Sequence, residues 1–330
     1  MGPNASGKTN FLEAIYYLSC GKSFRAKDES LIGWEEVFTR IEAEVKTPEN
    51  KKSESLAAIL ENHGRLTKTI QIKGQKVASS KLLGHMQSVL FSPEEIELIS
   101  TLPEARRRYL NMIISQSDRR YALSLVHFRR ALEHRNHLLK SINLGQAKES
   151  ELEVWDGKLS EYAAEMIEKR DLYVQSINKY LGGYYQKLAG TEQKLELQYV
   201  PSISPTEGWA GMVTRLAQSR PRDILARVTT IGPHRDDIAF LMDGRNLLTF
   251  ASRGELRTVI LALKLAEVDF LAQISGQRPI LLLDDVFSEL DEQRRDLLSQ
   301  IFVNQQTIIT TTDLDHVSAN IVSRAKVIRL

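Results

Sequence analysis

The chain has 330 residues, of which 42% are hydrophobic and 26% charged, as is typical of a globular protein of one or two domains. Its net charge is only +2, so the protein as a whole does not create a strong positive electrostatic field that would attract nucleic acid. Any nucleic-acid binding must therefore depend on local basic patches. The single cysteine, Cys20, excludes an intramolecular disulfide, and no apolar run reaches the roughly 18 residues of a membrane span. We therefore expect a cytoplasmic protein.

A phosphate-binding loop opens the sequence, because residues 2–9 fit the pattern G-x-x-x-x-G-K-[ST]. Glycines in such a loop let backbone N–H groups surround phosphate oxygens, while Lys8 can reach the β- and γ-phosphates and the Thr9 hydroxyl can bind Mg²⁺. A nucleoside triphosphate is the expected ligand. The residues expected to contact it are Gly2, Pro3, Asn4, Ala5, Ser6, Gly7, Lys8, Thr9 and Asn10.

The loop normally joins a buried strand to a helix, and here only the helix is evident, over residues 10–18. Met1 alone precedes the loop. We therefore expect the sheet to lack a central strand, leaving the apolar strand 280–283 with unpaired backbone groups that each cost about 1 to 3 kcal/mol. On this basis the chain is expected to aggregate or to bind ATP poorly.

The middle of the sequence changes from strands to helices. Alternation of apolar and polar residues over 38–45, 56–60 and 67–72 predicts an antiparallel β-layer. From Pro93 onward, apolar residues recur every three or four positions over 105–114, 121–141 and 153–180. This spacing predicts a helical insertion of about a hundred residues.

The densest positive charge lies within this insertion. Residues 101–140 contain nine Lys or Arg against the three acids Glu104, Asp118 and Glu133, a local net charge of +6. Such clusters neutralise DNA phosphates with little regard to base sequence. A solvated helix face is the alternative interpretation of any charge run. The predicted DNA contacts are Arg106, Arg107, Arg108, Arg119, Arg120, Arg129 and Arg130.

The last third of the sequence predicts alternating strands and helices. Strands are expected over 195–200, 279–283 and 307–312, and helices over 208–225 and 255–272. A hairpin is predicted from 238–242 and 247–250, since Asp243-Gly244 between them is a strong turn signal.

Two acidic residues, Asp284 and Asp285, end the apolar strand 280–283 in the form of a Walker B motif. Asp284 is the expected Mg²⁺ ligand, together with Thr9. Asp285 is the expected catalytic residue alongside Lys8, because a carboxylate near the γ-phosphate can polarise the attacking water or accept its proton. A core strand followed by an acidic turn is the alternative.

A third part of the nucleotide site is predicted at the start of the helix 255–272. A hydroxyl and a glycine there would meet phosphate where the helix dipole and free N–H groups favour negative charge. An ordinary capping box is the alternative. The expected contacts are Ser252, Gly254 and Glu255.

In this order the motifs resemble the ATP-binding-cassette (ABC) heads of SMC and Rad50 proteins, and within that class the RecF family. The Gly-Pro-His-Arg-Asp-Asp string at 232–237 and the doubled aspartate are specific to RecF-like sequences. Further matching segments are 7–10, 12–16, 21–25, 91–94, 106–110, 135–139, 262–267, 283–286 and 310–313.

The resemblance implies an α/β fold, a P-loop ABC-type ATPase head with a mixed sheet and an inserted α-helical lid. The head would comprise residues 1–92 and 193–330, and the lid 93–192. This sequence differs from most members of the family at Arg253, Glu255 and Leu256, where they usually carry glutamine.

The resemblance also implies an ATP- and Mg²⁺-dependent homodimer in which each nucleotide lies between the P-loop of one subunit and residues 252–255 of the other. RecF-like proteins are weak, DNA-dependent ATPases that bind single-strand/double-strand DNA junctions and act with RecR and RecO to load RecA at gaps. An ABC transporter ATPase subunit is one alternative, disfavoured by Thr310, Thr311 and Thr312 and by the basic insertion. An inactive truncated remnant is the other.

Overall fold

The computed structural model describes residues 1–3, 5–46, 53–100, 102–291, 294–296, 298 and 305–330. They form two compact units: Met1–Ile96, Tyr184–Thr191 and Gly254–Leu330 make up the first, and Glu97–Gly183 and Glu192–Arg253 the second. Residues 193–253 were expected to belong to the ATPase head. The structure differs, because the strands of this segment pack with the helices of the insertion in the second unit.

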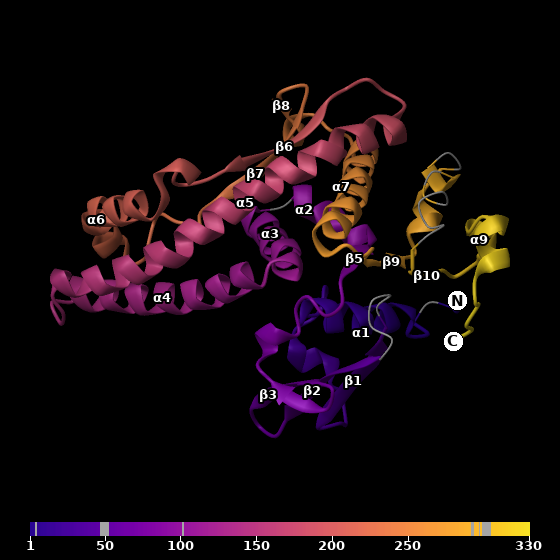
Figure 1. Cartoon of the computed structure of the whole chain (residues 1–330), viewed down its shortest axis with the longest axis horizontal. Helices are drawn as coiled ribbons and strands as arrows, with labels where there is room; N and C mark the ends of the chain where they lie inside the picture. The colour runs from indigo at the N-terminus through magenta and orange to yellow at the C-terminus, as the bar shows by residue number, and fades with distance from the viewer. Residues whose placement is uncertain (4, 47–52, 101, 292–293, 297, 299–304) are drawn as a thin grey trace. The chain divides into compact units, whose positions relative to one another are not determined.

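The first unit contains a parallel sheet in the order β10-β9-β5 (Figure 1). Its strands are β5 (Ser88–Phe91), β9 (Ile280–Asp284) and β10 (Thr307–Thr310). β9 pairs with β10 along one edge and with β5 along the other. The expectation of unpaired backbone groups on the strand 280–283 is therefore wrong, and with it the reason for expecting aggregation or poor ATP binding. β5 supplies the second neighbour, and its four residues are too few for periodicity to identify as a strand.

Helices of the first unit carry much of its apolar core. They are α1 (Lys8–Cys20), α7 (Arg253–Ser275, in this unit from Gly254) and the short α9 (Ala319–Arg324). α7 is buried on almost every face from Leu256 to Leu271, and its buried residues include the charged Lys264 and Glu267.

The predicted antiparallel layer is present in the same unit, in the order β1-β2-β3-β4. Its strands are β1 (Phe38–Val45), β2 (Glu54–Asn62), β3 (Leu66–Ile72) and β4 (Gln75–Val77). Tyr17 and Leu18 of α1 share a buried cluster with apolar side chains of β2 and β3. The layer therefore supports the helix that begins at the P-loop.

The second unit is mainly helical (Figure 1). Its helices are α2 (Glu97–Ser100), α3 (Pro103–Ser117), α4 (Arg119–Asn143), α5 (Leu152–Ala189, in this unit to Gly183) and α6 (Gly208–Ala226). α4 and α5 run side by side, joined by stacking of His134 on Trp155 and by an ion pair between Asp118 and Lys169. Asp118 also caps α4 by accepting hydrogen bonds from two backbone N–H groups in its first turn.

An antiparallel sheet of β6 (Leu195–Val200), β7 (Asp237–Met242) and β8 (Arg245–Asn246) completes the second unit. The predicted turn is confirmed, with positive φ at Asp243 (48°) and Gly244 (76°). The predicted second strand, 247–250, is wrong: the observed strand is Arg245–Asn246 and shares no residue with it. The Asn246 side chain accepts a hydrogen bond from the N–H of Leu248 and starts a 3₁₀ turn, so residues 247–249 leave the ladder.

A buried charge cluster lies within the first unit. The Lys264 side chain is 1% exposed, and its Nζ lies 2.6 Å from Glu95 Oε1 and 3.2 Å from Glu267 Oε1. The Lys264 ammonium thus forms ion pairs with both carboxylates. Burial raises the pKa of Glu95 to about 7, against the opposing attraction of Lys264.

Replacing Glu95 by Gln should flatten the pH dependence of the free energy of unfolding. The folded-state pKa of about 7 exceeds the unfolded value, so folding takes up a proton. The parent should therefore lose stability as pH rises between these pKa values, by at most about 1.4 kcal/mol per pH unit. Urea unfolding across this window measures the slope. Glu29→Gln, on an exposed side chain, is the control, and equal slopes for Glu95→Gln and the parent would contradict the prediction.

Candidate nucleotide site and nucleic-acid interface

The P-loop makes a tight turn into α1. Ala5 and Gly7 both have positive φ, 65° and 93°, and Gly7 is the N-cap of the helix. Left-handed residues beside a helix N-terminus direct backbone N–H groups into a concave, anion-binding surface. A side chain at Gly2 would be crowded, since a Cβ there would lie 2.8 Å from the backbone oxygen of Leu330 and 2.6 Å from Ser6 Oγ. Asn4, a predicted contact, lies outside the described residues.

The Lys8 side chain folds back into its own loop. Its Nζ donates hydrogen bonds to the carbonyl oxygens of Gly2 (2.7 Å) and Pro3 (2.6 Å). The residue is 9% exposed. A single positive charge is thus held inside the loop that the sequence predicts to bind phosphate.

Thr9 and Asp284 come together although 275 positions separate them in the sequence. Thr9 Oγ1 donates a hydrogen bond to Asp284 Oδ1 at 3.1 Å. These two oxygen ligands suit Mg²⁺, which binds through one or two carboxylates together with phosphate and water oxygens. The residues present therefore fit the cation.

Asp285 has an unusual backbone. Its φ of 50° and ψ of 25° place it in the left-handed region, and its N–H donates to Thr310 O at 3.2 Å. Its Oδ1 is buried and has no hydrogen-bond partner among the described residues. A buried carboxylate oxygen left in this way can accept a hydrogen bond from water or ligand. This property suits the predicted role of Asp285 at the reacting phosphate.

Two residues near these motifs were not assigned to the site from the sequence. Arg25 donates to Glu13 Oε2 at 3.0 Å and to the side-chain oxygen of Asn10, which ties the segment after α1 to the P-loop helix. Thr310 contacts Asp284 from the end of β10. No motif pattern identifies either contact, because each depends on pairing between separate segments.

The other predicted nucleotide contacts lie around the first turn of α7. Ser252 and Gly254 are exposed and Glu255 is half-buried. The helix begins at Arg253, between the predicted serine and glycine.

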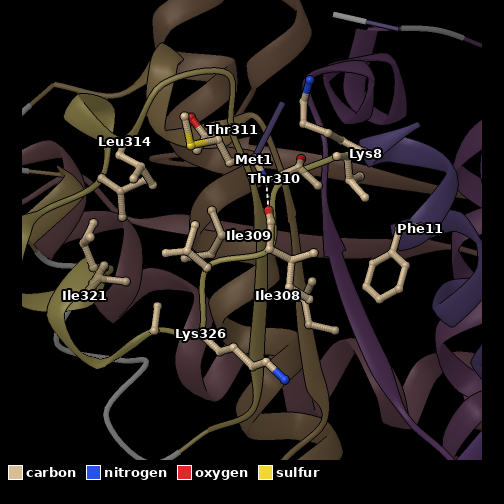
Figure 2. A pocket seen from close by; sticks show the side chains of 16 residues that line it. Met1, Lys8, Phe11, Ile308, Ile309, Thr310, Thr311, Leu314, Ile321 and Lys326 are labelled. Atoms are coloured by element: carbon tan, nitrogen blue, oxygen red, sulfur yellow. Dashed lines mark hydrogen bonds between the residues drawn. The ribbon is translucent and has the colours of Figure 1, made fainter. Parts of the chain in front are cut away.

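An apolar cavity of about 170 Å³ lies beside β10 in the first unit (Figure 2). Its walls include Ile308 and Ile309 of β10 and Ile321 of α9, with Lys8 at one side. Asp284 and Asp285 do not line it. Aliphatic walls of this kind do not suit a triphosphate, although the cavity adjoins the P-loop at Lys8.

The predicted DNA-binding arginines separate into buried and exposed sets. Arg106 is 6% exposed and forms a two-pronged ion pair with Asp237, at 2.7 Å and 2.8 Å. Arg107 is half-buried and donates to the carbonyl oxygen of Asp236 at 3.0 Å. The prediction is corrected for Arg106, whose guanidinium is used inside the unit and is not available to DNA. The exposed members are Arg108, Arg119, Arg120, Arg129 and Arg130.

The partners of Arg106 and Arg107, Asp237 and Asp236, belong to the Gly-Pro-His-Arg-Asp-Asp string at 232–237. The Asp236 carboxylate is fully buried and accepts hydrogen bonds from Arg170 (3.0 Å), from the Ser202 N–H (2.8 Å) and from the Tyr199 hydroxyl. Burial lowers the pKa of His234 to about 4, so this side chain is neutral at physiological pH. The string therefore organises the interior of the second unit.

The chain matches the model of the RecF/RecN/SMC N-terminal domain over residues 1–328. It is 37% identical over 326 residues to the DNA replication and repair protein RecF of Moorella thermoacetica, covering 98% of this chain and 86% of that protein. The protein of the same name from Geobacillus thermodenitrificans is 35% identical, with 100% and 90% of the two chains covered. The chain belongs to the RecF family.

Solved structures agree on the fold. The structure of the recombination mediator protein RecF-ATP in the RecFOR pathway has a TM-score of 0.89 at 34% identity, covering 94% of this chain and 84% of that one. An Smc head domain from Pyrococcus furiosus has a TM-score of 0.51 at 17% identity, over 97% and 84% of the chains, and shares the fold alone. The predicted P-loop ABC-type ATPase fold is confirmed. No helix among the described residues has the length and apolarity to cross a membrane.

Replacing Arg106 by Leu should lower the free energy of unfolding by about 2 kcal/mol, since hydrogen bonds to charged groups contribute about 1.5 to 3 kcal/mol and Asp237 would lose its partner. Urea unfolding measures this change. The matched control is the exposed neighbour Arg108→Leu, expected within about 0.5 kcal/mol of the parent. An Arg106→Leu protein as stable as the parent would show that the ion pair contributes little.

Proposed function

We propose that this chain is an ATP-dependent DNA-binding protein of recombinational repair and replication restart. The observation that carries the proposal is the hydrogen bond between Thr9 of the P-loop and Asp284 of the Walker B strand. This bond brings together the two predicted Mg²⁺ ligands at the start of α1, where the P-loop would bind the phosphates. Membership of the RecF family, together with the RecF-ATP structure among its relatives, supports ATP as the nucleotide.

In this proposal each residue of the site has a separate role in ATP hydrolysis. Backbone N–H groups of residues 5–9 and the Lys8 ammonium would bind the phosphates. Mg²⁺ held by Thr9 and Asp284 would neutralise charge on the phosphate oxygens. Asp285 would orient the attacking water and accept its proton, since its Oδ1 is buried and has no partner in the described part of the chain. We expect weak, DNA-dependent ATPase activity.

ATP would act by joining two copies of the chain. In this proposal the P-loop of one subunit and Ser252, Gly254 and Glu255 of the other enclose each nucleotide. The exposure of Ser252 and Gly254 beside the start of α7 is consistent with contact to a ligand held by another subunit. Slow hydrolysis would then open the dimer and release DNA.

The dimer would bind single-strand/double-strand junctions and act with RecR, and through it with RecO and RecA. The RecFOR pathway, in which the structural relatives are named as acting, supports RecR and RecO as partners. DNA contact would use the exposed arginines of α3 and α4. None of these five side chains forms a salt bridge within the described residues, so their charges are not neutralised by close carboxylates.

We expect the parent chain to dimerise with ATP and not with ADP, because only the γ-phosphate can reach both Lys8 and the opposing Ser252. Ser252→Arg should bind ATP yet stay monomeric, and Lys8→Ala should lose ATP binding. Sedimentation velocity with each nucleotide measures the oligomeric state, and calorimetry measures binding. Ser150→Arg, at another exposed serine, is the control. An ATP-dependent dimer of Ser252→Arg would exclude the sandwich arrangement.

Reversing two exposed charges with Arg129→Glu and Arg130→Glu should weaken binding to duplex DNA of any sequence. The slope of log affinity against log salt should become shallower by roughly 0.9 for each DNA phosphate that these arginines neutralise in the parent. Fluorescence anisotropy at several salt concentrations measures both quantities. Arg245→Glu, exposed on β8, makes the same type of charge change outside the cluster. Unchanged affinity and slope would favour the solvated-face alternative.

A further inference from the structure

We propose that Thr310 is a positioning residue that holds both Walker B aspartates in place for ATP hydrolysis. The inference rests on the proposed ATPase function and adds to it a residue outside the P-loop, Walker B and signature motifs. Thr310 is the last residue of β10 and lies in register with Asp284 on the neighbouring parallel strand β9. It is 6% exposed, so water does not compete freely for its hydroxyl.

The Thr310 hydroxyl bridges the two acids. Its Oγ1 lies 2.6 Å from Asp284 Oδ1 and accepts a hydrogen bond from the Asp285 N–H at 3.2 Å. A hydroxyl has one proton and two lone pairs. The proton goes to Asp284, because the other acceptor within reach, the Leu283 carbonyl oxygen, is 3.4 Å away and uncharged.

For Asp284, this bond fixes the rotation of the carboxylate. Oδ1 accepts from Thr310 at 2.6 Å and from Thr9 at 3.1 Å, so hydroxyls from β10 and from the P-loop meet on the same oxygen. The Thr9 bond depends on the conformation of the phosphate-binding loop. The Thr310 bond does not, because both of its partners lie on paired strands of the sheet. Thr310 therefore keeps the metal-side carboxylate in position when the loop rearranges.

For Asp285, Thr310 supports a strained backbone. A left-handed non-glycine residue costs free energy and persists only where its surroundings determine it. Here the Asp285 N–H meets both the hydroxyl and the carbonyl oxygen of Thr310, each at 3.2 Å. Without the hydroxyl, the N–H keeps only the carbonyl acceptor and the Asp285 carboxylate is less well fixed.

The experiment compares Thr310→Val, which keeps the shape and removes the hydroxyl, with Thr310→Ser, which keeps the hydroxyl. Thr307→Val is the matched control on the same strand, because its hydroxyl contacts the Gln305 carbonyl oxygen and neither aspartate. Two readouts are measured: kcat as a function of Mg²⁺ concentration, and the gain in affinity for a non-hydrolysable ATP analogue on adding Mg²⁺. Thermal unfolding checks that each variant is folded.

We expect Thr310→Val to lower kcat by about 10-fold or more and to lose most of the Mg²⁺-dependent gain in affinity, with Mg²⁺-free nucleotide affinity unchanged. Thr310→Ser should recover both readouts to within about 2-fold, since it restores the donor. Thr307→Val should behave as the parent. A merely structural role would lower thermal stability without this dependence on Mg²⁺.

Several results would overturn the inference. Parent-like kcat and Mg²⁺ dependence in Thr310→Val would show that the hydroxyl is dispensable, and an equal loss in Thr310→Ser would show that the methyl group matters instead. If the parent binds the analogue with a Mg²⁺-dependent gain but does not hydrolyse ATP, the hydrolysis step of the proposed function fails while the affinity readout still tests Thr310. A parent that binds no nucleotide overturns both proposals.

Discussion

The parallel pairing of β9 with β5 and β10 is the constraint on which the candidate nucleotide site depends. Carboxyl ends of parallel strands meet at one edge of a sheet, so residues that follow the three strands gather there. This edge holds Asp284 and Asp285 after β9 and Thr310 at the end of β10. The P-loop reaches the same edge through the bond from Thr9 to Asp284. The register of the paired strands thus brings these side chains together. A shift of β10 by one residue along β9 would separate Thr310 from Asp284.

In the second unit the corresponding constraint is the burial of charge. Arg135 has no exposed surface and lies 2.7 Å from Asp156 and 2.8 Å from Asp223. Removing one partner of such a pair leaves an uncompensated charge in the interior, which costs far more than loss of a surface pair. The arginine-rich sequence of this unit therefore has two separate uses. One set of guanidinium groups fixes the interior, and another remains at the surface of α3 and α4.

Much of the fold could be predicted because its elements are long and periodic. β1 was predicted with its observed bounds, and the helices α3 to α7 were all expected. β5 was missed because four residues carry no distinguishable period. The expectation for β9 rested on the lack of a strand before the P-loop and did not allow for β5 as a neighbour. The burial of Arg106 could not be predicted from the sequence either, since its partner Asp237 lies 131 positions away. Local motifs reveal the P-loop and the Asp284-Asp285 pair, whereas contacts made by register, such as that of Thr310, require the structure.

The position of Lys8 indicates how the γ-phosphate could control the site. Its ammonium already makes two short hydrogen bonds to loop carbonyls, so phosphate binding exchanges these bonds for charge-assisted ones. The net gain is therefore smaller than the strength of a new lysine–phosphate contact, because the loop carbonyls lose their donor. A ligand must supply enough additional contacts to compensate for this loss. A triphosphate offers more oxygens than a diphosphate to the N–H groups of the loop and to the Lys8 ammonium, so in the proposed site ATP would compensate for this loss better than ADP.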